Sequence, residues 1–243
     1  MTTIIISTND LGDAQRKDFE ESVAALLRER GLAVLVTPPI YHVSEDDEVW
    51  AEIAKASGPV IALSWLYPRP VEWLFRRHGA GCAGLRTFHL DEYKTPEECA
   101  DACTELLPPV PAAEQGTITR LSCTFVKRWY PVIDYSRCVN CGQCMQFCLF
   151  GVYALQDEKV SVMNPDGCKP GCPACSRVCP RGAIMFPLYD DEAIAGAPGR
   201  FVTPDDAAKA MYEKRTRRPY RQPADAGLDA LIDDLDRLTE GRL

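Results

Sequence analysis

Over the first hundred residues, the spacing of apolar positions switches repeatedly between strand-like and helix-like. Short β-branched or apolar runs predict strands over 3–7, 33–36, 59–63 and 85–90. Apolar residues at three- and four-residue spacing predict helices over about 13–30, 70–79 and 95–106, and another through 49–54. Because the two kinds of element alternate, we expect a parallel sheet with helices on both faces, a three-layer α/β domain.

The predicted helices carry recognisable start signals. Thr95, Pro96 and Glu98 form a capping box with proline at the first helical position, and Ser44 with Asp47 resembles a similar cap. Glycines end the first and third helices. These signals fix where we expect the helices to begin and end.

The loops that follow the strands are where an open α/β sheet binds its ligands. None of them carries G-x-G-x-x-G or G-x-x-x-x-G-K-[ST], so neither a nicotinamide dinucleotide nor a P-loop nucleotide is supported. Residues 7–10 have the serine and threonine of a flavodoxin phosphate loop but not its glycine, which keeps a flavin as an alternative. The aromatic segment 65–69 is expected to cover a neighbouring domain or a partner.

A proline-rich stretch over 107–116 is the best candidate for a domain boundary. We expect a Rossmann- or flavodoxin-like domain over 1–106, the linker over 107–116, a second domain over 117–189 and a helical C-terminal extension over 190–243. Within the extension, 205–212 and 225–238 have helical patterns. The basic run from Lys214 to Arg221 either packs on acidic surface of the same protein or docks a partner.

Two cysteine runs dominate the chemistry of the second domain. The first is Cys138-x2-Cys141-x2-Cys144-x3-Cys148 and the second is Cys168-x3-Cys172-x2-Cys175-x3-Cys179, followed by Pro180; together they hold eight of the 12 cysteines. Three thiolates at such close spacing can hold three corners of one iron–sulfur cube, and the fourth corner must come from elsewhere. Residues 148–155 align with 179–186, so the runs belong to two halves of an internal repeat.

The segment from about 129 to 189 resembles a bacterial-type ferredoxin with two [4Fe-4S] clusters. The resemblance implies a ferredoxin-like α+β fold in which each half has a cysteine loop, a short helix and an apolar strand. Two departures from the family pattern stand out. Leu149 occupies the place where proline usually follows the first run, and one extra residue separates Cys168 from Cys172, which reshapes that loop.

The resemblance also implies which cysteines share a cluster, because in this family the fourth cysteine of each run reaches across to the other cluster. Cluster I would take Cys138, Cys141, Cys144 and Cys179, and cluster II would take Cys168, Cys172, Cys175 and Cys148. So small a domain needs the clusters as part of its core. Apolar residues expected to shield the clusters from water are Val139, Met145, Phe147, Val178 and Ile184.

Other interpretations of the cysteines fit less well. A zinc site uses paired C-x2-C knuckles with four ligands per ion. A disulfide scaffold needs an oxidising compartment, and the N-terminus lacks the pattern of an export signal. The radical-SAM triad spacing also occurs from Cys168 to Cys175, but that fold needs a large barrel after the triad, and few residues follow Cys179.

The remaining cysteines and the histidines show no ligand spacing. Cys99 and Cys103 share one face of the last predicted helix, so we expect buried thiols, and Cys82 and Cys123 are expected to be structural. Cys123 lies in a strand-like stretch over 121–126. The three histidines are scattered and suggest neither a metal site nor a catalytic pair: His42, His78 and His89.

Charge and hydropathy limit the partners and the cellular location that we expect. With 35 acidic against 27 basic residues and a net charge of −8, the chain is not expected to bind nucleic acid. No stretch approaches 18 consecutive apolar residues, so no membrane span is expected. Without an export signal, and with cluster-type cysteines, the sequence favours the cytoplasm.

These observations predict electron transfer through two [4Fe-4S] clusters, by a carrier or by a subunit of a redox complex. A non-catalytic protein with redox partner proteins as donor and acceptor is favoured over an enzyme. Two alternatives stay open: a redox enzyme whose α/β domain binds a flavin or a small substrate, and a structural or sensing iron–sulfur protein. The sequence names neither the donor and acceptor, nor the cluster potentials, nor the oligomeric state.

Overall fold

Five parallel strands form one sheet in the N-terminal part, in the order β4-β3-β1-β2-β5. The computed structural model describes residues 2–9, 12–56, 58–80, 84–107 and 116–199. β1 lies at the centre, with β2 on one side and β3 on the other, so the winding of the chain reverses at β1. The strands are β1 (Thr3–Ser7), β2 (Ala33–Thr37), β3 (Val60–Ser64), β4 (Arg86–His89) and β5 (Ile118–Arg120).

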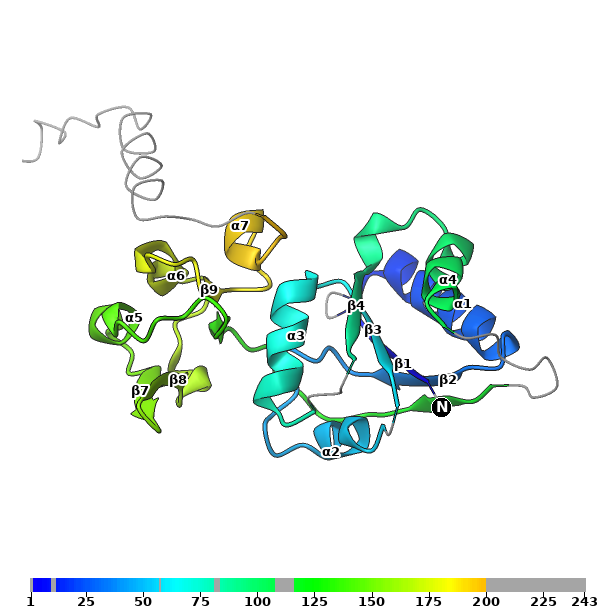
Figure 1. The fold of residues 1–243 in the computed structure, drawn as a ribbon, viewed down its shortest axis with the longest axis horizontal. Coiled ribbons are helices and arrows are strands. Elements are labelled where there is room, and N and C mark those ends of the chain that lie inside the picture. Colours follow the sequence, from blue (N-terminus) through cyan, green and yellow to red (C-terminus); the bar gives the residue numbers. More distant parts are fainter. Residues whose placement is uncertain (1, 10–11, 57, 81–83, 108–115, 200–243) are drawn as a thin grey trace, which may run out of the picture. The chain divides into compact units, whose positions relative to one another are not determined.

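Helices cover both faces of this sheet, which confirms the predicted three-layer α/β fold (Figure 1). One face carries α1 (Ala14–Glu29) and α4 (Pro96–Glu105), and the other carries α2 (Glu48–Ala54) and α3 (Pro68–Arg77). Successive side chains of a strand point to opposite faces. Ile4 and Ile6 therefore pack with α1 and α4, while Ile5 packs with α2 and α3.

The helix starts follow the expected caps with two adjustments. Thr95 Oγ1 accepts a hydrogen bond from the Glu98 backbone N–H at 3.3 Å, as the capping box predicted. Asp47 rather than Ser44 caps α2, because its carboxylate accepts from the Val49 N–H at 2.9 Å. α3 begins at Pro68, two residues before the expected Pro70, since a second proline also suits the first turn.

β5 lies beyond the proline-rich segment, in residues that the sequence-based division gave to the second domain. It pairs in parallel with β2, and the Leu121 N–H continues the ladder by donating to the Val36 carbonyl at 2.8 Å. Residues 121–126, expected to be strand-like, form no strand. Three residues with a single apolar side chain give no readable period, so the sequence pattern missed β5. The domain division itself stays a prediction.

The cysteine-bearing part has two similar halves, as the internal repeat predicted. The first half runs β6 (Val132–Ile133), α5 (Gln143–Phe147) and β7 (Tyr153–Gln156), and the second runs β8 (Lys159–Val162), α6 (Ala174–Val178) and β9 (Ile184–Met185). β6 pairs with β9 and β7 with β8, both antiparallel. A short α7 (Glu192–Ala195) follows, and single turns η1 (Leu90–Glu92) and η2 (Pro165–Gly167) complete the described elements.

One apolar cluster contains residues of both parts. Tyr130, Val132 and Met185 pack in the same cluster as side chains of α2 and α3. The rings of Tyr41 and Tyr130 stack with centroids 4.4 Å apart. The Tyr41 hydroxyl donates to the Tyr130 carbonyl at 2.5 Å and accepts from the Tyr130 N–H at 2.7 Å, while the Tyr130 hydroxyl donates to the Tyr41 carbonyl at 2.9 Å. These contacts fasten the cysteine-bearing part to the sheet.

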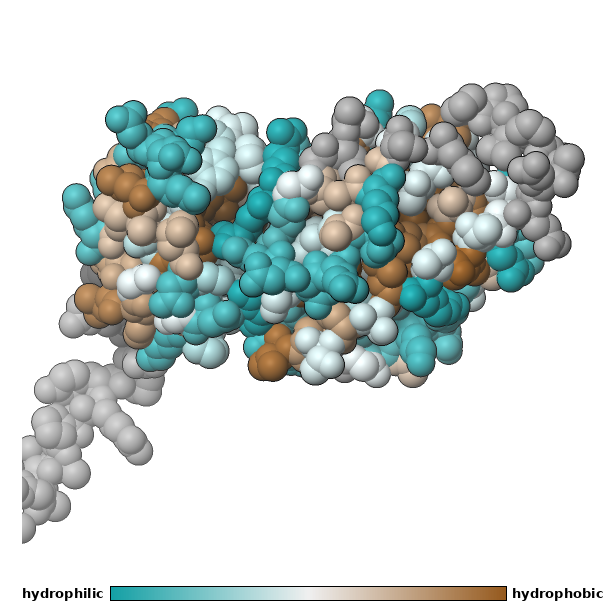
Figure 2. Space-filling view, turned by 90° about the horizontal axis from the view of Figure 1, so that it is seen from below, coloured by the Kyte–Doolittle hydropathy of each residue, from teal (hydrophilic) through white to brown (hydrophobic). Residues whose placement is uncertain are grey.

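Hydrophilic and hydrophobic side chains are interspersed on the face turned to the viewer in Figure 2. In the part of the chain that the structure describes, no helix has the length and apolar character needed to cross a bilayer. The predicted helices over 205–212 and 225–238, the basic run from Lys214 to Arg221, and Cys82 lie outside the described residues.

Candidate metal centres

A first cavity lies between the loop after β6 and the end of α6. Its cysteines are Cys138, Cys141 and Cys144 of the first run and Cys179 of the second. The rest of the lining includes the apolar side chains of Ile133, Val160 and Ile184 but no histidine or carboxylate. Thiol sulfur is therefore the only strong metal ligand in this lining, and a donor set of four sulfurs suits an iron–sulfur cluster.

The loop that carries the first cysteine run contains residues with left-handed backbone, which turn the chain so that its cysteines line the cavity. Asn140 and Gly142 have φ of 54° and 75°. Asparagine visits this region because its short side chain can hydrogen-bond nearby. Here the Asn140 side-chain oxygen accepts a hydrogen bond from the Val160 N–H at 3.2 Å, which ties the loop to β8. Cys144 then faces the cavity from α5.

A second cavity is lined by Cys168, Cys172 and Cys175 of the second run and by Cys148 of the first. The extra residue between Cys168 and Cys172 is accommodated by Gly171, whose φ is 75°. The Cys172 N–H closes this turn by donating to the Lys169 carbonyl at 3.1 Å. The insertion thus widens the loop but keeps Cys172 in the lining.

Each cavity gathers the four cysteines that the sequence pattern had grouped together. The crossing arises because the last cysteine of each run caps the C-terminal end of a five-residue helix, Cys148 on α5 and Cys179 on α6. The two helices pack against each other. Each helix end therefore reaches the cavity of the opposite half. The donor chemistry of both linings fits a [4Fe-4S] cluster.

The protein surroundings disfavour free thiolates in both cavities. Burial raises the pKa of Cys144 to about 11 and the pKa values of Cys168 and Cys175 to about 12. A thiolate that coordinates a metal is deprotonated outright, because the cation supplies the missing charge. The Ala183 N–H also donates to Cys179 Sγ at 3.3 Å.

Shielding by apolar residues is uneven. Ile184 is 3% exposed, as expected for a residue that excludes water. Val139 and Phe147 also line the cavities, but 58% and 53% of their surfaces remain exposed, so they form rims and leave the edges near solvent. Leu149, in place of the usual proline, is 91% exposed at the rim of the second cavity. That rim is apolar and accessible.

The other thiols and the histidines form no comparable site. Cys99 and Cys103 are fully buried between α1 and α4, as expected. Their mutual hydrogen bond and burial hold the pKa of Cys99 far above its usual range. Cys123 is partly buried. Among the described residues, no three His, Cys, Asp or Glu side chains converge closely enough to hold a single metal ion.

The carboxyl edge of the α/β sheet is occupied by a carboxylate. The Glu20 side chain accepts hydrogen bonds from the Asn9 backbone N–H at 2.7 Å and from Trp65 Nε1 at 2.6 Å. Asn9 belongs to the loop that shares hydroxyl residues with a flavodoxin phosphate loop. Its amide therefore points to a buried acid, and like-charge repulsion opposes a phosphate at this position. The geometry gives no support to a flavin phosphate there.

The segment 65–69 serves both parts of the protein. Trp65 and Tyr67 pack within the α/β part, against Phe19 and His89. Arg69 instead reaches the cysteine-bearing part, where its Nη2 donates to the Gly182 carbonyl at 2.7 Å. The expectation that this segment covers a neighbouring domain therefore holds for Arg69, whereas the aromatic rings before it belong to the α/β part.

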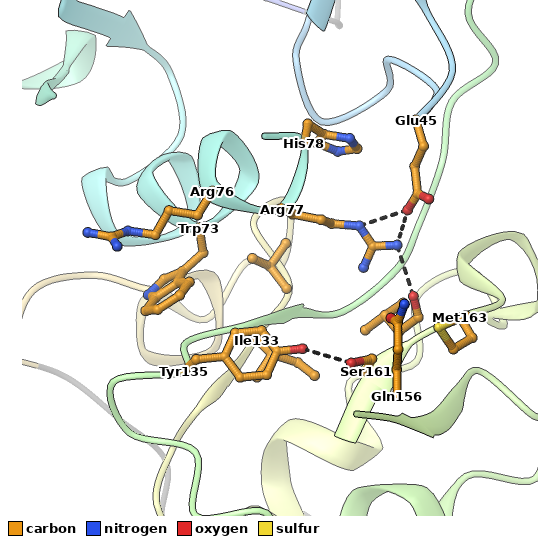
Figure 3. Close-up of a pocket in the computed structure, with 12 residues that line it drawn as sticks. Glu45, Trp73, Arg76, Arg77, His78, Ile133, Tyr135, Gln156, Ser161 and Met163 are labelled. Atoms are coloured by element: carbon orange, nitrogen blue, oxygen red, sulfur yellow. Dashed lines mark hydrogen bonds and ion pairs between the residues drawn. The ribbon is translucent and has the colours of Figure 1, made fainter. Parts of the chain in front are cut away.

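A further pocket of about 570 Å³ lies between α3 and the strands of the cysteine-bearing part. Figure 3 shows Trp73 and Tyr135 together at one end, with Arg77 extended toward Glu45. The rings of Trp73 and Tyr135 pack edge to face with their centroids 5.6 Å apart. Arg77 Nη2 donates a hydrogen bond to the Val162 carbonyl at 2.9 Å. Ile133 lines both this pocket and the first cysteine cavity, so the two are neighbours.

Sequence reasoning missed several residues that hold or surround these sites. Nothing in the local pattern marks Arg69 or the Tyr41–Tyr130 pair, because their partners are distant along the chain. Tyr153 carries a signal that the repeat could have revealed. It stands at the same spacing after Cys148 as Ile184 does after Cys179, so the two halves differ there by one hydroxyl-bearing ring.

Comparisons with known proteins agree with the cysteine chemistry. The 4Fe-4S binding domain family matches residues 131–148. An uncharacterized ferredoxin of Methanocaldococcus jannaschii is 50% identical over 60 residues, which are 24% of this chain and 41% of that relative. The chain thus spans less than half of that protein. A second uncharacterized ferredoxin of the same organism is 41% identical over 54 residues, or 21% of this chain and 86% of the relative.

A ferredoxin of Methanothermococcus thermolithotrophicus is 39% identical over 54 residues, which are 21% of this chain and 88% of the relative. The two shorter relatives are thus covered almost completely by a region the size of the cysteine-bearing part. The similarity in sequence and the two cysteine-lined cavities lead to the same assignment. The chain belongs to the ferredoxin family, as an iron–sulfur protein with a 4Fe-4S binding region and an α/β domain before it.

Proposed function

We propose that this protein transfers electrons through two [4Fe-4S] clusters, passing them between a donor and an acceptor protein. Cluster I is held by Cys138, Cys141, Cys144 and Cys179, and cluster II by Cys168, Cys172, Cys175 and Cys148. The observation that carries the proposal is that each of two cavities is lined by four cysteines drawn from both runs. Four sulfur ligands per site are what a [4Fe-4S] cluster requires.

Other residues of the chain would exclude water from the clusters, tune their potentials and contact partner proteins. A bound cluster supplies one-electron chemistry, and the protein sets its potential through burial and hydrogen bonds to sulfur. Ile133, Val160 and Ile184 exclude water from the first cavity. Phe147, Leu149 and Phe150 leave an exposed apolar rim at the second cavity, which suits contact with a partner protein. We assign docking or assembly to the α/β domain.

An anaerobic reductive titration followed by EPR tests the proposal. We expect about eight irons and eight labile sulfides per chain, and two interacting signals of reduced [4Fe-4S] type at low potential. One signal, or four irons per chain, would contradict the two-cluster assignment. Reducible clusters that exchange no electrons with any ferredoxin-dependent oxidoreductase would favour a structural or sensing role instead.

The pocket between α3 and the cysteine-bearing part favours a second candidate function, that of a redox enzyme. A small molecule there would lie next to the first cavity, because Ile133 belongs to both linings. Trp73 and Tyr135 offer aromatic rings to a planar molecule such as a flavin, while Arg76 and Arg77 are paired with Glu72 and Glu45. Titration with FMN, followed by flavin fluorescence, tests this function. Quenching that is lost in Trp73→Ala supports it, and unchanged fluorescence contradicts it.

A further inference from the structure

Tyr153 is a buried hydroxyl without an ordinary partner. It is the first residue of β7, pairs with Val162 and is 7% exposed. Among the described residues, its hydroxyl has no hydrogen-bond partner of normal geometry. A buried donor left unpaired costs about 1–3 kcal/mol, so its retention calls for an explanation.

The surroundings of this hydroxyl are cysteine sulfurs. Tyr153 lines the second cavity together with Cys148 and Cys175, and it packs in one apolar cluster with Cys175 and Cys144. A phenolic hydroxyl carries its proton at neutral pH, so it can donate a hydrogen bond. Cys175 lines the same cavity and is itself buried, with 8% of its surface exposed.

The internal repeat provides a comparison within the same chain. Ile184 occupies the position in the second half that Tyr153 occupies in the first. Ile184 lines the first cavity and is 3% exposed. One cavity therefore has a phenolic donor at this position, whereas the other has hydrocarbon. The two sites have the same number of cysteines but different hydrogen-bonding capacity.

We propose that the Tyr153 hydroxyl donates a hydrogen bond to Cys175 Sγ and thereby gives cluster II a higher reduction potential than it would otherwise have. Reduction adds negative charge, part of which falls on the cysteine sulfurs, so a donor stabilises the reduced form more than the oxidised form. This increase favours transfer of an electron from cluster I to cluster II, which would oxidise the first and reduce the second. Tyr153 is a positioning residue, and this inference rests on the proposed two-cluster function.

Tyr153→Phe tests the proposal because it removes one oxygen and keeps the ring. We expect iron and labile sulfide to stay at wild-type levels and only one of the two reduction steps to move to lower potential. We expect the equilibrium constant for reduction of that cluster to fall about tenfold, which for one electron lowers its potential by about 59 mV. The matched control is Tyr189→Phe, which removes a hydroxyl of the same part of the chain that accepts from Arg177 Nη2 at 2.9 Å. It should move neither step.

A second measurement keeps the test decisive if the variant assembles poorly. Electron–nuclear double resonance needs only a small assembled fraction of Tyr153→Phe: the reduced wild-type protein should show an exchangeable proton coupled to cluster II that is lost in D₂O and that the variant lacks. Absence of that proton, or unchanged potentials in Tyr153→Phe, would overturn the inference, as would an equal shift of both steps. If the wild type itself lacks two reducible clusters, the proposed function fails, which is a separate result.

Discussion

The guanidinium of Arg69 lies 3.0 Å from the carboxylate of Asp134, measured from Nε to Oδ2. Arg69 belongs to α3 in the α/β part, whereas Asp134 follows β6 and leads into the first cysteine loop. Their side chains are 15% and 3% exposed. Asp134 is further held by the Ser136 N–H, which donates to its carboxylate at 3.0 Å. The ion pair thus joins the α/β domain to the segment that presents Cys138.

Arg69→Met should destabilise the protein strongly, because it leaves the Asp134 carboxylate buried without its main counter-charge. Removing one member of a buried pair costs about 3–5 kcal/mol, and we expect the lower end of that range because Arg137 is also near Asp134. Urea unfolding under anaerobic conditions measures the change. Arg76→Met is the matched control, since Arg76 pairs with Glu72 at the surface and should cost less than about 1 kcal/mol. Equal losses of unfolding free energy in the two variants would show that the buried ion pair stabilises the protein no more than the surface pair does.

The Tyr41–Tyr130 contact predicts an unequal response to two similar substitutions. Tyr41→Phe removes a hydroxyl that donates to one backbone carbonyl and accepts from one N–H, so both groups of Tyr130 stay buried and unpaired. Tyr130→Phe removes a single hydrogen bond. We expect a loss of about 2–4 kcal/mol for the first and about 1–2 kcal/mol for the second. Urea unfolding of both variants checks the order, and a larger loss for Tyr130→Phe contradicts it.

Cysteine substitutions should reveal the crossing between the two runs. Cys148→Ala is expected to remove about half of the iron and the EPR signal of cluster II, although Cys148 belongs to the first run. Cys144→Ala should remove the other signal, because Cys144 lines the first cavity. Cys99→Ala, in the core between α1 and α4, should leave both clusters in place. If Cys148→Ala and Cys144→Ala abolish the same signal, the crossed ligand sets are wrong.

The sequence was informative wherever one local rule decided the outcome. Alternating periods predicted the three-layer α/β part, and the Thr95 cap was predicted to the residue. The two cysteine runs pointed to four-sulfur sites because metal ligands are rare, specific and closely spaced. The internal repeat predicted a cysteine loop, a short helix and an apolar strand in each half, whereas the pairing of β6 with β9 and of β7 with β8 came only from the structure.

The sequence was uninformative where the deciding partner lies far away along the chain. β5 is too short to show a period and depends on β2 for its pairing. Arg69 looked like part of an aromatic loop, and only the fold brings it to Asp134. The role of Asn9 was also misleading, because a hydroxyl-rich loop resembles a phosphate site until Glu20 is seen to accept its amide hydrogen. Such contacts are products of tertiary packing.

His78 predicts how stability changes with pH. Burial lowers its pKa to about 4, assisted by the nearby charge of Arg77, and its ring stacks on Trp50 with centroids 4.0 Å apart. In the unfolded chain His78 takes up a proton near pH 6.5, whereas in the folded chain it stays neutral until the pH is much lower. The free energy of unfolding therefore falls as the pH drops below about 6.5. Between pH 7.5 and 5.5 we expect a loss of about 1 kcal/mol, reduced for partial solvent exposure. His78→Phe keeps the stacked ring without the proton, so its unfolding free energy should change less over this range, and a parallel decline in both proteins would exclude His78 as the cause.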